Sequence, residues 1–173
     1  PAIGPLILLF FVITFAFAMM ESVFSIFAQQ VMGQSNTGIY KLMIFIGLVI
    51  AFVGGYVVRK AVKFIPEQIW MIVGSAVLCL GLAILPTCAH PGWIYLPLAV
   101  LSVGHGIASP CLMSLISRCA GDHEQGNVLG TSQSGSALAR LLGPILGGGI
   151  FYDYFGPNWP FWIAAFIMGC ATI

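Results

Sequence analysis

The sequence predicts an all-α transmembrane protein, a bundle of six helices. Of its 173 residues, 60% are hydrophobic and only 6% are charged, whereas soluble domains carry roughly 25% charged residues. The mean hydropathy is +1.03, and apolar stretches close to the roughly 20 residues that span a bilayer recur along the chain. The expected partner of this surface is therefore the lipid bilayer. A net charge of +1 offers no basic surface for nucleic acid.

Each apolar stretch is expected to be a helix, because lipid leaves an open backbone without hydrogen-bond partners. The connections are short and rich in Gly, Pro, Asn and Ser, which form turns. All 173 residues are assigned to one transmembrane unit, and its last helix is expected to continue beyond the sequence. The expected helices span residues 5–30, 38–58, 69–85, 93–116, 128–152 and 159–173.

A weak internal repeat divides these helices into two units of three. Glycines end the second helix at Gly54-Gly55 and the fifth helix at residues 147–149. Because each unit has an odd number of helices, the second unit is inverted relative to the first, an arrangement known in transporters.

Basic residues predict the orientation, because cytoplasmic loops are enriched in Lys and Arg. Lys41 is the single basic residue expected on the opposite side. The loops at 59–67 and 118–125 are therefore expected in the cytoplasm. Their basic residues are Arg59, Lys60, Lys63 and Arg118.

Glu21 lies within the first apolar helix. A carboxylate in hydrocarbon costs at least about 2.5–3.5 kcal/mol, so Glu21 is expected to face a wet cavity, pair with a cation or carry a proton. Burial favours the protonated form of a carboxyl group. Glu21 is therefore the candidate site for proton coupling or substrate contact, and the alternative is a structural ion pair.

Arg140 lies within the fifth helix and cannot lose its charge, so it requires a carboxylate, an anionic substrate or backbone carbonyls. It is about 21 Å from the cytoplasmic end of its helix, and Glu21 is about 25 Å from the same side. These depths overlap, so an ion pair between them and separate roles in the pathway both remain open.

His105 and Gln133 are the other candidate pathway residues. His105 lies between two glycines, about 18 Å from the outer end of the fourth helix, and could relay protons or simply bond a backbone carbonyl. Gln133 lies among serines in the fifth helix. So many polar residues predict that one face of this helix meets a cavity.

Small residues recur every four positions along the fifth helix, and such stripes let helix backbones approach closely. We expect this stripe to pack on another helix, either in this chain or in a partner half. We also expect Pro144 to bend the helix. By polarity, helices 69–85 and 159–173 should face lipid while the other four line a pathway. The predicted packing residues are Gly135, Ala139, Gly143, Pro144, Gly147 and Gly148.

Neither a cofactor nor a metal is expected. The five cysteines form no CxxC pair. The spans contain no paired carboxylates, metal-ligand spacing or nucleophile–base constellation, so an enzyme is the least favoured class.

Several motifs resemble the major facilitator superfamily over essentially the whole chain. Residues 125–130 (QGNVLG) and 138–148 (LARLLGPILGG) resemble its helix eleven, and residues 109–118 resemble the end of helix ten. Met20-Glu21 resembles an acidic position of helix seven. Residues 54–60 resemble the second copy of a Gly-x-x-x-Asp-Arg loop motif, although Arg59 stands where that motif has Asp.

The resemblance is strongest to the drug:proton antiporter branch that includes tetracycline efflux proteins. It implies that the chain is the C-terminal half, helices seven to twelve, of a twelve-helix transporter in the bacterial inner membrane. The N-terminal six-helix half of the same protein would be its partner. A small-molecule substrate would bind between the halves, with helices seven, eight, ten and eleven lining the pathway.

The expected function is secondary active transport, with proton-coupled efflux of small amphipathic molecules or drugs by alternating access. A facilitator or importer of an anionic metabolite on the same fold is the first alternative, with Arg140 as the anion site. A non-transporting membrane scaffold or sensor is the second alternative. Glu21 and the polar fifth helix argue against a scaffold, which need not carry their cost.

Overall fold

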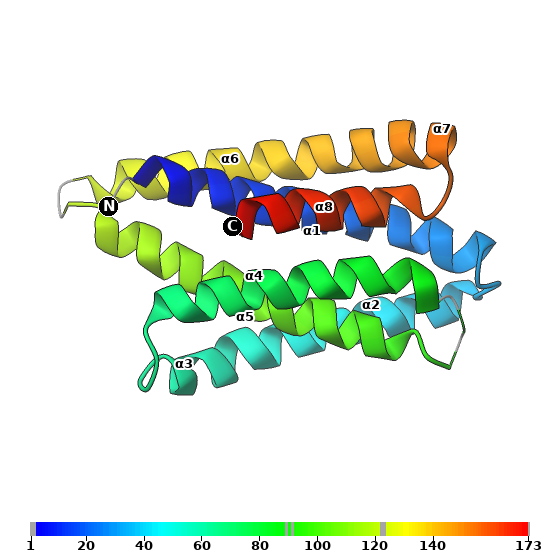
Figure 1. Cartoon of the computed structure of the whole chain (residues 1–173), viewed down its shortest axis with the longest axis horizontal. Helices are drawn as coiled ribbons and strands as arrows, with labels where there is room; N and C mark the ends of the chain where they lie inside the picture. Colours follow the sequence, from blue (N-terminus) through cyan, green and yellow to red (C-terminus); the bar gives the residue numbers. More distant parts are fainter. Residues whose placement is uncertain (1–2, 89, 91, 122–123, 173) are drawn as a thin grey trace.

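The computed structural model describes residues 3–88, 90, 92–121 and 124–172, and these form helices joined by short turns. No strand occurs within these residues, so the all-α prediction is confirmed. The helices form rods that lie side by side along the bundle (Figure 1). The rods are α1 (Ile3–Gln30), α2–η1–α3 (Asn36–Phe52, Val53–Val57, Val58–Ala61), α4–η2 (Glu67–Ile84, Leu85–Cys88), α5 (Tyr95–Cys119), α6–η3–α7 (Gln125–Leu146, Gly147–Tyr152, Asp153–Phe155) and α8 (Trp159–Thr172).

Four rods of the described chain can cross a membrane by length and composition. The rod formed by α6, η3 and α7 is long enough but contains too many polar residues to count as a span. Helix α8 is apolar but has only 14 residues. The four candidate spans are Ile3–Gln30, Asn36–Ala61, Glu67–Thr87 and Tyr95–Cys119.

Local signals in the sequence account for the helix ends. Gly33 adopts a φ of 62° after α1, a conformation that glycine adopts at little cost. The Ser35 side chain then accepts a hydrogen bond from the Gly38 backbone N–H at 3.3 Å and begins α2. Gly156, with a φ of 104°, makes the turn between α7 and α8.

Two expected loop boundaries are corrected by the structure. Arg59 and Lys60 lie in α3, which continues the second helix to Ala61, and Lys63 lies in the turn that follows. Pro66 disfavours helical backbone at Ile65, so the helix cannot continue directly into α4. Arg118 lies in the last turn of α5.

Glycines occur in a π-helical turn of each of two rods. Gly54 and Gly55 lie in η1, and residues 147–149 lie in η3. π-Helical turns often accompany functional sites. The glycines that suggested an internal repeat therefore mark a similar local irregularity in both rods.

The rods form two groups. α1 packs against α6 and α8 in one group, and α5 packs against α4 and α2 in the other (Figure 1). Contacts of α4 with α8 and of α1 with α5 join the groups. Both groups contribute to the main hydrophobic core, which contains large side chains such as Phe24, Phe27 and Phe161. The rings of Phe27 in α1 and Phe161 in α8 meet edge to face at 5.0 Å.

Glycines set the spacing of α4 and α5. A Cβ added at Gly81 would lie 2.5 Å from the backbone nitrogen of Leu101, and one at Gly74 would lie 2.7 Å from that of Ala108. Gly104 approaches the backbone of Leu78 in the same way. The two helices are thus in backbone contact along much of their length.

The small-residue stripe of α6 packs on α1, within this chain. A Cβ at Gly143 would lie 2.9 Å from the Met19 nitrogen, Ala139 is fully buried, and Gly147 also approaches Met19. The remaining members of the predicted set do not share this contact. Gly135 and Gly148 have open space around them, and Pro144 is exposed.

Candidate functional site

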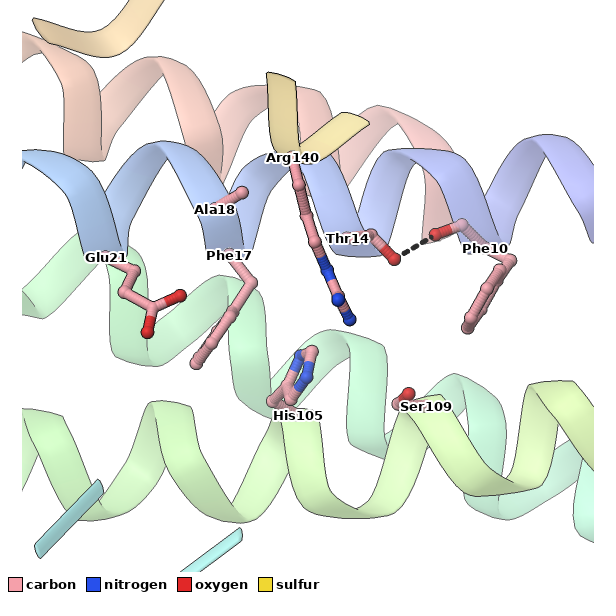
Figure 2. A pocket seen from close by; sticks show the side chains of 8 residues that line it. All are labelled: Phe10, Thr14, Phe17, Ala18, Glu21, His105, Ser109 and Arg140. Atoms are coloured by element: carbon pink, nitrogen blue, oxygen red, sulfur yellow. Dashed lines mark hydrogen bonds between the residues drawn. The ribbon is translucent and has the colours of Figure 1, made fainter. Parts of the chain in front are cut away.

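A polar cavity lies between α1, α5 and α6 and continues toward α2. Its first compartment has a volume of about 350 Å³. An adjoining compartment of about 390 Å³ shares four of its lining residues and reaches Ile50 of α2 and Gly54 of η1. The four rods that polarity singled out therefore supply the lining. The first compartment, shown in Figure 2, is lined by Phe10, Thr14, Phe17, Ala18, Glu21, His105, Ser109 and Arg140.

Glu21 reaches the cavity from the face of α1 that is turned away from the core. Its neighbours Met19 and Met20 are fully buried, whereas Glu21 itself is exposed. Within the described residues Glu21 has no ion-pair partner, because the single ion pair there joins Arg118 and Glu67.

Arg140 enters the cavity from α6. Ala139 is buried at the contact of α6 with α1. Arg140, the next residue, is therefore directed away from that contact. Figure 2 shows the Arg140 side chain extending beside α1 toward Ser109 and His105 of α5. The structure thus brings Glu21 and Arg140 into one cavity without pairing them.

The glycines on either side of His105 bring α5 into contact with two neighbouring helices. Gly104 lies against α4, while a Cβ at Gly106 would lie 3.2 Å from the Ile50 carbonyl oxygen of α2. The imidazole stacks on the Phe17 ring, with centroids 4.0 Å apart and planes inclined by 19°. Its Nδ1 atom is buried and has no hydrogen-bond partner among the residues described.

Gln133 lines the second compartment with Arg140. The two residues are seven positions apart on α6, which places them on one face of the helix. Ser132 and Ser134 do not contribute to this lining, and their hydroxyls donate to backbone carbonyls four residues earlier.

Sequence reasoning missed the apolar part of the lining. Phe10, Thr14 and Phe17 precede Glu21 on one face of α1, and the Thr14 hydroxyl donates to the Phe10 carbonyl at 2.8 Å. Their helical spacing relative to Glu21 was an available signal. In an entirely apolar segment, however, this spacing does not by itself distinguish a cavity face from a lipid face.

An ion pair between the buried Glu67 and the exposed Arg118, at the basic end of the bundle, was also missed. Arg118 Nη2 lies 3.5 Å from Glu67 Oε1. The Glu67 side chain is 8% exposed, and its second oxygen has no hydrogen-bond partner in the described chain. Arg59 lines a small cavity beside Glu67, and Lys60 Nζ donates to the Tyr56 hydroxyl at 2.6 Å.

These features define the class of protein. Several helices are long and apolar enough to cross a membrane. A carboxylate, a guanidinium, an imidazole and aromatic rings converge on a cavity between them. The chain is accordingly a multi-pass integral membrane protein with a polar site inside its helical bundle.

The particular family follows from comparison with known sequences. The pattern of the Major Facilitator Superfamily matches residues 1–144, and the chain belongs to this family. It is 26% identical to the class C tetracycline resistance protein of Escherichia coli over 83% of this chain and 36% of that protein. It is 28% identical to major facilitator superfamily domain-containing protein 10 of Bos taurus over 84% of this chain and 32% of that protein.

A third relative, the class B tetracycline resistance protein of Escherichia coli, is 34% identical over 46% of the chain and 19% of its own length. The resemblance to tetracycline efflux proteins seen in the sequence is therefore confirmed. The chain spans about a third of the length of the first two relatives.

Proposed function

We propose that this chain is the C-terminal six-helix half of a proton-coupled exporter of small amphipathic molecules, working by alternating access. In this proposal the six rods all cross the bacterial inner membrane as two inverted three-helix units. The basic end, with Arg59 and Arg118, faces the cytoplasm. The N-terminal half closes the open side of the cavity.

The observation that carries the proposal is the position of Glu21. It is a carboxyl group within an apolar helix, it lines a cavity of about 350 Å³, and it has no ion-pair partner among the described residues. A membrane protein bears the cost of such a group where it serves transport. Similarity to tetracycline resistance proteins supports the direction of export.

In this mechanism, proton binding at Glu21 and substrate binding in the cavity compete or alternate. The aromatic rings of Phe10 and Phe17 offer apolar contact to an amphipathic molecule. Arg140, His105 and Gln133 contact its polar groups. The two halves rock about the site, so that protons and substrate reach it from opposite sides in turn.

The test uses the transporter that contains this chain in inverted membrane vesicles. An acid-inside proton gradient is followed with a fluorescent reporter while lipophilic cations, antibiotics and metabolites are added. We expect some compounds to dissipate the gradient and Glu21→Gln to abolish this response at unchanged expression. Glu124→Gln is the matched control, because Glu124 is an exposed residue outside the cavity. A wild-type response from Glu21→Gln would refute the assignment.

A carrier for anionic metabolites is the second candidate, and the exposed Arg140 favours it. Arg140 lines both compartments of the cavity and, like Glu21, forms no ion pair within the described part of the chain. A guanidinium in this setting suits a carboxylate or phosphate group. A preference for anions that is lost in Arg140→Gln, without any response of the proton gradient, would support this candidate over export.

A further inference from the structure

Phe17 occupies a special position in the cavity. It precedes Glu21 by four residues, one turn of α1, and its ring stacks on His105 at 4.0 Å. The stacked pair therefore bridges α1 and α5 inside the cavity. Figure 2 shows the Phe17 ring with Glu21 on one side and the Arg140 side chain on the other.

The two charges on either side of this stack should attract each other. Glu21 and Arg140 have opposite charges and line the same compartment, so Coulomb attraction favours a pair between them. No ion pair joins them in the described structure. The Phe17 ring lies between the two side chains in Figure 2.

The imidazole half of the stack is held in place by its helix. Gly104 fixes α5 against the backbone of α4, and Gly106 fixes it against the backbone of α2. Phe17 is equally constrained, because α1 is anchored by the buried Met19 and Met20.

We propose that Phe17 is a positioning residue: its ring, stacked on His105, separates Glu21 from Arg140 and prevents a permanent ion pair. Its value for coupling rests on the proposed function, since a carboxylate paired with Arg140 would bind a proton less readily. The other titratable or charged groups that line the compartment are His105 from α5 and Arg140 from α6, and the remaining elements supply none.

Removing the ring should let the pair form. In Phe17→Ala, the Arg140 side chain gains the space between itself and Glu21, which lies about 6 Å further along α1 from residue 17. Glu21 then becomes an ion-paired carboxylate. The double variant Phe17→Ala, Arg140→Gln removes the new partner and should free Glu21 again. Phe17→Trp keeps an aromatic barrier and should behave as the wild type.

The test is labelling of Glu21 by dicyclohexylcarbodiimide, which reacts with protonated carboxyl groups in apolar surroundings. The purified transporter containing this chain is labelled at one fixed pH, and the modified peptide is quantified by mass spectrometry. Phe17→Ala should reduce labelling roughly tenfold, equivalent to about 1.4 kcal/mol of added ion-pair stabilisation. The double variant should restore it.

Phe11→Ala is the matched control, because Phe11 is on the same helix but stacks on Phe15 and lies outside the cavity lining. It should leave labelling unchanged. If Phe17→Ala does not yield a monodisperse protein, Phe17→Leu removes the ring with less lost volume and carries the same expectation.

Three results would overturn the proposal: wild-type Glu21 that resists labelling, unchanged labelling in the ring-deleted variant, or a loss that Arg140→Gln does not restore. Labelling does not depend on transport. If the labelling pattern holds while Glu21→Gln still couples normally, the barrier stands and the proposed coupling role fails.

Discussion

Replacing Gly81 with Ala should loosen a close backbone contact between α4 and α5. An added Cβ would lie 2.5 Å from the Leu101 backbone nitrogen, and ordinary van der Waals contact begins at 3.4 Å. The helices must therefore separate by about 0.9 Å at this point, the difference between these two distances. Backbone atoms cannot rotate away as a flexible side chain can.

Such overpacking costs about 1–3 kcal/mol, partly offset by up to about 1 kcal/mol from the better helix propensity of Ala. A net loss of up to about 2 kcal/mol should lower the thermal midpoint of the purified protein by up to about 8 °C. Size-exclusion chromatography after heating in detergent measures this midpoint. Gly47→Ala is the control, because nothing lies within 4 Å of its added Cβ. Equal midpoints for the two variants would refute the account of the α4–α5 contact.

Two further predictions concern charge and capping. Arg118→Gln should destabilise the protein by about 1–3 kcal/mol, because it leaves the buried Glu67 carboxylate without its ion-pair partner. Glu67→Gln should cost less than about 1 kcal/mol, since Arg118 is 72% exposed and keeps its water; equal thermal midpoints would contradict this asymmetry. Ser35→Ala should cost about 1 kcal/mol by removing the cap on Gly38, and Ser35→Asp should restore the midpoint.

Much of the architecture could be predicted because lipid imposes simple rules. Each apolar stretch had to satisfy its own backbone, and glycine, proline and serine marked the turns. The ends of the second helix were less predictable. Nothing between Val58 and Ala61 interrupts a helix, so it runs past the basic residues that looked like a loop.

The charged residues that line the cavity could be singled out as candidates from the sequence alone. Glu21 and Arg140 stand out within predicted membrane helices because burying a charge in lipid is costly. Whether they touch was not predictable, since depth along a helix does not give the direction of a side chain. The structure places both in one cavity, and the ring of Phe17 lies between them.

The glycines of α5 connect the packing of the bundle to the chemistry of its cavity. Gly104 and Gly106 bring α5 into backbone contact with α4 and α2, and the residue between them is His105. A larger residue at either contact would shift the imidazole and hence the ring stacked on it. Substitutions at these glycines should therefore change the labelling of Glu21 by dicyclohexylcarbodiimide, although neither glycine contacts it. Gly47→Ala, at an open position of α2, should leave this labelling unchanged. The precision of the site is thus set by how closely the helix backbones approach, because the side chains that line it have few hydrogen bonds to hold them.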